Sequence, residues 1–290
     1  MNFKLLAAIL LAPQMIPAEV HAQASLTQAQ DILTSAVHHW KSDQRFISDN
    51  GNDALAYVPL NSIEYPWSAI GILTSVTSNG ETVFTRFCTA TLVGPSLIVT
   101  AAHCVKDMPN LWFGLDYDRG NGDNVGCDVD YLWIAKDYEP GGLAHDWAFA
   151  HLNCNASGYG WLTFRKDLNL KEGETLPVTA VGYANNMTRA IVDQDCMVIG
   201  WEHSDILLKT NCASGYGSSG GPVFDQNQYI VGVMAKRSFT GDTYASPASD
   251  WGVDLNELRR FGALPPHDTS HARLVRLAAG ISAANRTAGD

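Results

Sequence analysis

Six cysteines form three pairs along the sequence, and each pair lies symmetrically about a segment that favours a turn. The midpoints fall near Pro95, Gly141 and Ser204. If each turn closes two antiparallel strands, the paired cysteines lie opposite one another, within bridging distance. Six cysteines allow many connectivities, and this geometry favours three of the possible bridges. They are Cys88–Cys104, Cys127–Cys154 and Cys196–Cys212.

Short β-rich runs separated by glycine and proline follow from residue 65 onward. Examples span residues 68–76, 88–93, 97–101, 179–183, 196–201 and 229–235. Many short strands at regular intervals are typical of a sandwich or of barrels. The chain has 290 residues, of which 46% are hydrophobic, so it can bury a sizeable core in one large domain or two smaller ones.

The first 22 residues have the pattern of an export signal. Lys4 supplies a positive start, Leu5 to Ala12 an apolar run, and Val20 to Ala22 a small-residue cleavage site. The apolar run is too short to span a bilayer. We therefore expect a signal peptide at 1–22 and a secreted or periplasmic protein, in a compartment where disulfides persist.

Two further segments flank the β-rich region. Residues 23–61 are predicted to be a pro-segment or N-terminal extension, because apolar residues between 25 and 40 have near-helical spacing. Residues 253–261 are predicted to form a closing helix. The tail at 263–290 is expected to be either helical around 272–279 or loose.

The net charge of the chain argues against two classes of binding partner. The net charge is −11, from 19 basic and 30 acidic residues, and no cluster of lysine or arginine offsets it. This sign opposes binding to nucleic acid and to anionic membranes. We expect neither as a partner, and we expect a monomer.

The segment 215–224 reads GYGSSGGPVF and places two adjacent serines among glycines. A flexible loop without chemistry is one interpretation, and a G-x-S-x-G nucleophile elbow of an α/β-hydrolase is another. The elbow requires a helix directly after the serine, but Pro222 to Phe224 favours a strand. The downstream candidates His267 and His271 lie in a proline-rich tail, so this context excludes the elbow.

Two upstream motifs support a third interpretation. Thr100 to Cys104 reads TAAHC after an apolar strand, and His145 to Ala148 reads HDWA at the head of another. With GSSGGP they give the order histidine, aspartate, serine. Over roughly 65–261 the chain therefore resembles the chymotrypsin-fold (trypsin-like) serine peptidases, most nearly the bacterial secreted ones.

The resemblance implies an all-β fold of two antiparallel Greek-key β-barrels with a C-terminal helix, at 62–158 and 159–262. It implies an endopeptidase acting on protein or peptide substrates without a cofactor. His103 would be the base that activates the nucleophile Ser219, and Asp146 would orient the imidazole. The backbone N–H groups of Gly217 and Ser219 would form the oxyanion hole.

The sequence departs from the family pattern at three places. Ser218 stands where the pattern has an aspartate that pairs with a new N-terminal ammonium, so that activation switch lacks its acid. The substrate pocket aligns with Ala213 and Ser214 and with Ala235, Lys236 and Arg237. Ala213 offers no acid to select arginine or lysine. The two basic residues could favour an acidic side chain or point to solvent.

Other functions on the same framework stay open. The same triad would serve a narrow-specificity, esterase-like hydrolase, and the same fold could carry a non-catalytic binding module. The loop 116–123 is rich in oxygen ligands, but its spacing does not fit an EF-hand, and we interpret it as a solvated acidic turn. We predict no metal.

Overall fold

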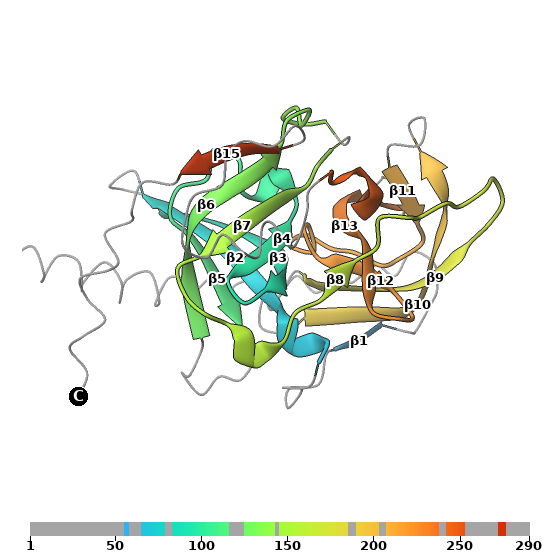
Figure 1. Ribbon diagram of the computed structural model, residues 1–290, viewed down its shortest axis with the longest axis horizontal. Helices are drawn as coiled ribbons and strands as arrows, with labels where there is room; N and C mark the ends of the chain where they lie inside the picture. Colours follow the sequence, from blue (N-terminus) through green and yellow to red (C-terminus); the bar gives the residue numbers. More distant parts are fainter. Residues whose placement is uncertain are drawn as a thin grey trace, which may run out of the picture.

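Two antiparallel β-barrels lie side by side in the computed structural model (Figure 1). The structure describes residues 55–57, 65–78, 83–115, 125–142, 145–184, 190–202, 207–237, 242–252 and 272–276. The expected fold class of two antiparallel β-barrels is confirmed. The predicted signal peptide, the closing helix at 253–261 and the acidic loop at 116–123 lie outside the described residues.

The first barrel has six strands in the order β6-β5-β2-β3-β4-β7, closed by pairing of β6 with β7. Its strands are β2 (Ile70–Ser78), β3 (Val83–Gly94), β4 (Leu97–Thr100), β5 (Leu111–Leu115), β6 (Val125–Ala135) and β7 (Ala148–Leu152). The β-branched and aromatic residues of these runs suit a pleated surface that is buried on one face. The 3-10 helix η2 (Ala102–Cys104) follows β4 directly.

The second barrel repeats this plan in the order β10-β11-β14-β13-β12-β9, closed by pairing of β10 with β9. Its strands are β9 (Leu176–Tyr183), β10 (Ala190–Glu202), β11 (Leu207–Thr210), β12 (Pro222–Asp225), β13 (Tyr229–Arg237) and β14 (Thr243–Pro247). Short 3-10 helices lie outside the strands, namely η1 (Trp67–Ala69), η4 (Ser157–Tyr159) and η5 (Ala248–Asp250).

Three further strands lie on the outside of the barrels. β1 (Leu55–Tyr57) pairs with β10 of the second barrel, and β15 (Ala272–Arg276) pairs with β6 of the first. β8 (Thr163–Phe164) runs parallel to β13. The alternatives of a helical or a loose tail are both wrong for 272–276, because this segment forms a strand there.

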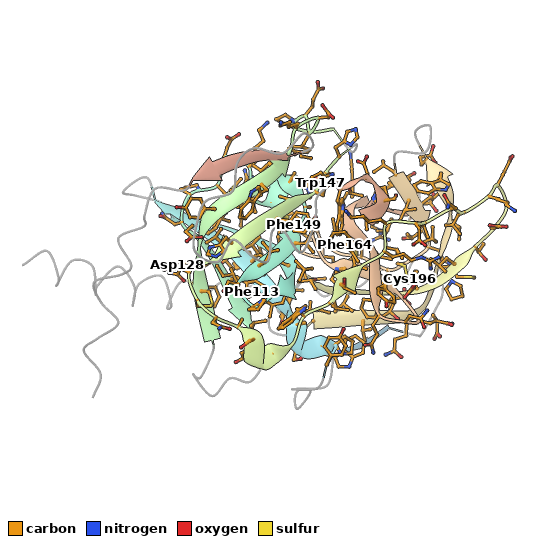
Figure 2. All side chains as sticks on the ribbon, viewed as in Figure 1. Phe113, Asp128, Trp147, Phe149, Phe164 and Cys196 are labelled. Atoms are coloured by element: carbon orange, nitrogen blue, oxygen red, sulfur yellow. A yellow bond between two sulfur atoms is a disulfide. The ribbon has the colours of Figure 1, made fainter. Side chains whose placement is uncertain are left out.

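Aromatic side chains pack between the two barrels, and the second barrel also has a hydrophobic cluster of its own. Trp251, which follows η5, packs edge-on against Phe149 of β7 at 5.5 Å and against Phe164 of β8 at 4.9 Å between ring centroids. Figure 2 shows Phe149 and Phe164 with Trp147 nearby. Such pairs contribute about 0.5–1.5 kcal/mol each beyond the burial of their area. The barrels therefore hold a fixed relative position.

All three cysteine pairs favoured by the turn symmetry are present as disulfides. Their Cα–Cα separations are 6.1 Å for Cys88–Cys104, 5.7 Å for Cys127–Cys154 and 4.8 Å for Cys196–Cys212. The first two lie within the first barrel and the third within the second. The described residues contain no helix long and apolar enough to reach across a membrane.

Candidate active site

His103 lies on η2, at the edge of the first barrel. β4, which precedes η2, is buried along its whole length, and the Cys88–Cys104 disulfide ties η2 back to β3. The Thr100 hydroxyl donates to the Thr89 carbonyl at 2.8 Å and fixes the end of β4. The segment that carries His103 is therefore held at both ends, while its imidazole stays partly exposed.

Asp146 lies beneath the imidazole and is only 2% exposed. Its carboxylate accepts two hydrogen bonds from the same residue, one from the His103 backbone N–H at 2.9 Å and one from Nδ1 at 2.7 Å. A carboxylate at Nδ1 keeps the proton of the neutral ring on that nitrogen, which leaves a lone pair on Nε2. The pair thus presents a base at Nε2.

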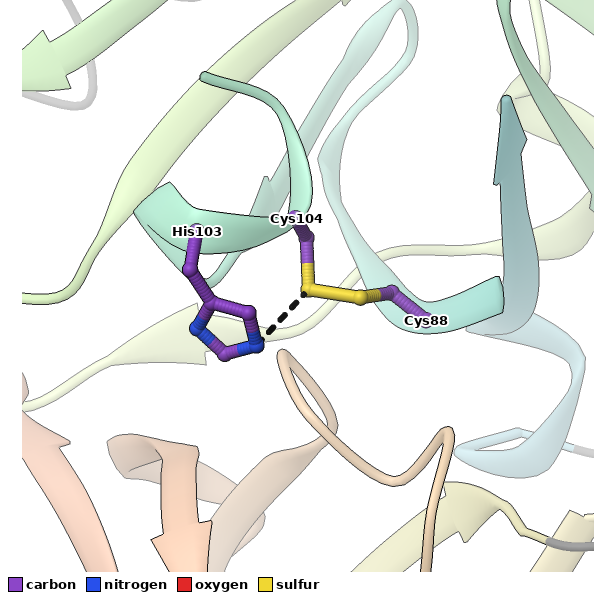
Figure 3. Close-up of side chains that lie close together, drawn as sticks. All are labelled: Cys88, His103 and Cys104. Carbon is purple, nitrogen blue, oxygen red and sulfur yellow. Dashed lines mark hydrogen bonds between the residues drawn. A yellow bond between two sulfur atoms is a disulfide. The ribbon is translucent and has the colours of Figure 1, made fainter. Parts of the chain in front are cut away.

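Ser219 lies on the loop between β11 and β12 of the second barrel, against the segment that carries His103. Its carbonyl accepts the Thr89 N–H at 2.8 Å and lies 3.7 Å from the Cys104 sulfur. The nearest recorded partner of His103 Nε2 is Cys104 Sγ at 3.6 Å (Figure 3). Within the described part of the chain, no hydrogen bond joins Nε2 to the Ser219 hydroxyl. Such contacts are often long before substrate binds.

The glycines of this loop make its path possible. Gly217 and Gly220 have φ values of +98° and +80°, which L side chains rarely adopt. A Cβ on Gly220 would lie 2.3 Å from the Thr89 carbonyl oxygen, so only glycine fits where the loop touches the first barrel.

The hydrogen bonds around Ser219 concern the N–H groups that could bind an oxyanion. The N–H groups of Ser218, Gly220 and Gly221 donate to Gly215, Met234 and Ser218 carbonyls, respectively. Among the described residues, the N–H groups of Gly217 and Ser219 have no acceptor. These two groups are therefore available to an anion, as an oxyanion hole requires.

Ser218 has a different environment from Ser219. It is buried, and its hydroxyl accepts the Gly215 N–H at 3.1 Å. A Cβ on Gly182 would lie 2.8 Å from its Cα, so the β9 backbone packs directly against it. Ser218 therefore holds the loop in shape.

Thr89 of β3 was missed by the sequence analysis, although it connects the two barrels at this site. Its hydroxyl donates to the Gly217 carbonyl at 2.9 Å and accepts the Tyr183 N–H at 2.9 Å, while its N–H binds the Ser219 carbonyl. It is fully buried. Its position one residue after Cys88 was the only available signal, and that signal does not predict partners in another barrel.

The predicted pocket residues occupy different environments. Ala213 and Ser214 precede Ser219 on its loop, and Ala235 is buried on β13. Lys236 is exposed, whereas Arg237 is partly buried and its Nη1 lies 3.5 Å from the Ser214 carbonyl oxygen. The Ser214 hydroxyl lies 2.8 Å from that of Thr243.

A buried acid beside the pocket was also missed. Asp193 of β10 accepts the Ala213 N–H at 2.8 Å through Oδ2, and its Oδ1 accepts the Asp195 N–H at 3.3 Å. Its carboxylate thus fixes the start of the loop. The available sequence signal was that Asp193 directly follows the apolar stretch Ala190 to Val192.

One group of side chains has the composition of a metal site. Cys88, His103 and Cys104 bring their ligand atoms within 4.8 Å of one another. The two sulfurs form a disulfide, however, so neither is a thiolate. Because metal binding by cysteine requires the thiolate, this group does not fit a metal ion.

Comparisons with known proteins agree with this fold. The family model described as Trypsin matches residues 61–243. A search of curated proteins found no match. Three solved structures illustrate the likeness in fold. A Glu endopeptidase in complex with MPD is 22% identical with a TM-score of 0.56, covering 72% of this chain and 98% of that one. GrC is 14% identical with a TM-score of 0.57, covering 71% and 97%. The protease Anisep from Arthrobacter nicotinovorans is 20% identical with a TM-score of 0.52, covering 67% and 94%.

Proposed function

The chain belongs to the trypsin family, and from that premise we propose that it is a serine endopeptidase that uses His103, Asp146 and Ser219. The observation that carries the proposal is the pairing of His103 with buried Asp146, next to the Ser219 loop. A serine hydroxyl is a weak nucleophile and needs such a base. Imidazole suits the task because its unperturbed pKa of about 6.5 lets it accept and return a proton.

In the proposed reaction, the Ser219 oxygen attacks the carbonyl carbon of the peptide bond while its proton passes to His103 Nε2. Asp146 stabilises the imidazolium that forms. The negative oxygen of the tetrahedral intermediate is placed between the Gly217 and Ser219 N–H groups, and one such donor is worth about 3–4 kcal/mol. Collapse breaks the C–N bond, and the proton on Nε2 leaves with the amine. Water then hydrolyses the acyl-enzyme by the same steps.

Adjacent serines allow a matched test of the nucleophile. Ser219→Ala should lower kcat by roughly 10⁶-fold and abolish labelling by a fluorophosphonate probe. Ser218→Ala should keep the label and most of the activity, because its hydroxyl bonds only within the loop. Labelling at Ser218, or activity that survives Ser219→Ala, would refute this assignment. A folded wild-type protein that neither takes the label nor cleaves peptides would support a binding module instead.

The cellular context proposed for this activity follows from the cysteines and the leader pattern. Three disulfides fit an oxidising compartment, so we place the enzyme outside the cytoplasm, secreted or in a periplasm. Its substrates would be proteins or peptides, and the enzyme would act as a monomer. Recovery of the protein from the culture medium or the periplasm tests its location. Size-exclusion chromatography of the recovered protein tests whether it is a monomer.

A further inference from the structure

Three polar side chains gather beside the Ser219 loop, at the end of β13 and the start of β14. Arg237 and Thr243 are direct partners in the antiparallel pairing of these strands. Thr243 shares a 2.8 Å hydrogen bond with the Ser214 hydroxyl, and Arg237 Nη1 lies 3.5 Å from the Ser214 carbonyl oxygen. Ser214 thus connects the guanidinium to the loop that carries Ser219.

This group lies close to the reacting centre. The Met234 carbonyl accepts the Gly220 N–H at 2.7 Å, and the Met234 N–H donates to Gly221 at 2.8 Å. β13 therefore runs beside the two residues that follow Ser219. Arg237 is three residues farther along this strand, about 10 Å away at the rise of a β-strand. The arginine side chain and the side chain of a bound substrate residue together can bridge that distance.

Hydrogen bonds hold Ser214, whose carbonyl contacts the Arg237 guanidinium, in a fixed position. Thr243 donates its hydroxyl proton to the Cys212 carbonyl at 2.8 Å, so the Ser214 hydroxyl must donate to Thr243. Both hydroxyl protons are thereby committed to the protein. Thr243 is almost fully buried and cannot exchange this arrangement for water. Ser214 is therefore held in place, and with it the carbonyl that contacts Arg237.

The positive charge and shape of the Arg237 guanidinium suit an anionic substrate group at this position. A guanidinium presents its N–H groups as a planar fork that matches a carboxylate. Ala213 contributes no charge, and the Asp193 carboxylate is engaged by the Ala213 and Asp195 N–H groups. Lys236, the neighbouring cation, is exposed and occupies the preceding position on the strand.

We propose that Arg237 selects substrates with an acidic residue, glutamate above all, directly before the cleaved bond. The proposal rests on the endopeptidase function proposed above. A substrate carboxylate would pair with the guanidinium, and an arginine or lysine side chain there would meet a like charge. Hydrogen bonds to charged groups are strong enough to give roughly 10- to 100-fold discrimination.

The test compares peptides that differ only in the residue before the cleaved bond, namely Glu, Gln, Ala and Arg. We expect kcat/KM for Glu to exceed that for the isosteric Gln by roughly 10- to 100-fold, with Arg the poorest substrate. Arg237→Gln should bring Glu and Gln to within about twofold. The matched control Lys236→Gln removes one positive charge from the adjacent, exposed position and should keep the preference. Equal rates for Glu and Gln with wild-type enzyme would overturn the proposal.

Labelling of Ser219 separates this proposal from the proposed function. A wild-type enzyme that takes the fluorophosphonate label but does not prefer Glu refutes only the role of Arg237. A wild-type enzyme without label or peptidase activity refutes the function itself. If Arg237→Gln does not fold, Arg237→Lys retains the charge without the fork and should reduce the Glu preference while keeping Glu above Gln. An unchanged preference in a folded, labelled Arg237→Gln variant would also overturn it.

Discussion

Asp146 accepts hydrogen bonds from both the backbone N–H and the Nδ1 of His103, at 2.9 and 2.7 Å. One carboxylate thereby fixes both the position of η2 and the tautomer of the ring. Replacing it with an amide of the same shape preserves packing but offers an N–H to Nδ1, which favours the opposite tautomer. This relationship connects the local structure directly to the proposed catalysis.

We therefore expect Asp146→Asn to lower kcat by about 10⁴-fold while the protein stays folded. The measurement is steady-state hydrolysis of a peptide substrate, with circular dichroism as the control for folding. Retention of more than a tenth of the wild-type kcat would show that Asp146 does not set the tautomer of His103.

Substitution of Thr89 tests whether contact between the barrels sets the geometry of the Ser219 loop. Thr89→Val keeps the shape of the side chain but removes the hydroxyl that binds the Gly217 carbonyl and the Tyr183 N–H. Each buried group left unpaired costs about 1–3 kcal/mol. We expect a lower free energy of unfolding in urea and slower fluorophosphonate labelling. Thr89→Ser, which restores the hydroxyl, should recover most of the labelling rate, and equal rates in all three proteins would exclude a positioning role.

Gly141 and Gly220 have similar φ values, so substituting each by alanine distinguishes the cost of backbone strain from the cost of steric contact. A Cβ on Gly220 would lie 2.1 Å from Thr100 Oγ1 and 2.3 Å from the Thr89 carbonyl oxygen, whereas one on Gly141 would meet nothing within 4 Å. Their φ values are +80° and +83°. Gly141→Ala should cost about 1–2 kcal/mol for the left-handed conformation alone. Gly220→Ala should cost clearly more and reduce activity, and similar unfolding free energies for the two variants would contradict this account.

Tyr138 gives the protein a pH-dependent stability in the alkaline range. Burial, together with the negative charge of Asp146, raises the pKa of Tyr138 to about 12 from the ordinary tyrosine value of 10.0. The folded state therefore keeps its phenolic proton at a pH at which the unfolded chain loses it. The resulting stability is present in full below pH 10 and decreases as the pH rises toward 12. Urea unfolding across this range should show a shallower decrease for Tyr138→Phe than for wild type.

The sequence predicts candidate residues where the prediction depends on short local motifs. The segments around His103, Asp146 and Ser219 each combine a reactive side chain with an apolar strand or a glycine loop. The orientation of Arg237 could not be read in this way, because a bulge between Met234 and Lys236 shifts the register of β13. A shift of one residue reverses which side chains share a face, so alternation in the sequence no longer predicts direction.

Non-local contacts account for the other gaps between sequence and structure. Asp193 and Thr89 act on partners in distant segments, the Ala213 N–H and the Gly217 carbonyl. β15 likewise pairs with a strand far earlier in the chain, although its sequence, ARLVR, has the composition of either a strand or a helix. The local sequence predicts neither these contacts nor the strand β15, because partner segments elsewhere in the chain stabilise them.

The outermost strands have a consequence for how the protein is made. β15 adds to β6 of the closed first barrel, although it lies far later in the chain, and β1, which lies far earlier, adds to β10 of the second barrel. β15 is therefore synthesised roughly 120 residues after β7. At about 5–20 residues per second this is a delay of roughly 6–24 seconds. During that interval Tyr131 to Ala135 of β6 lack the strand that pairs with them in the folded protein, so this edge can pair with another chain until β15 is present.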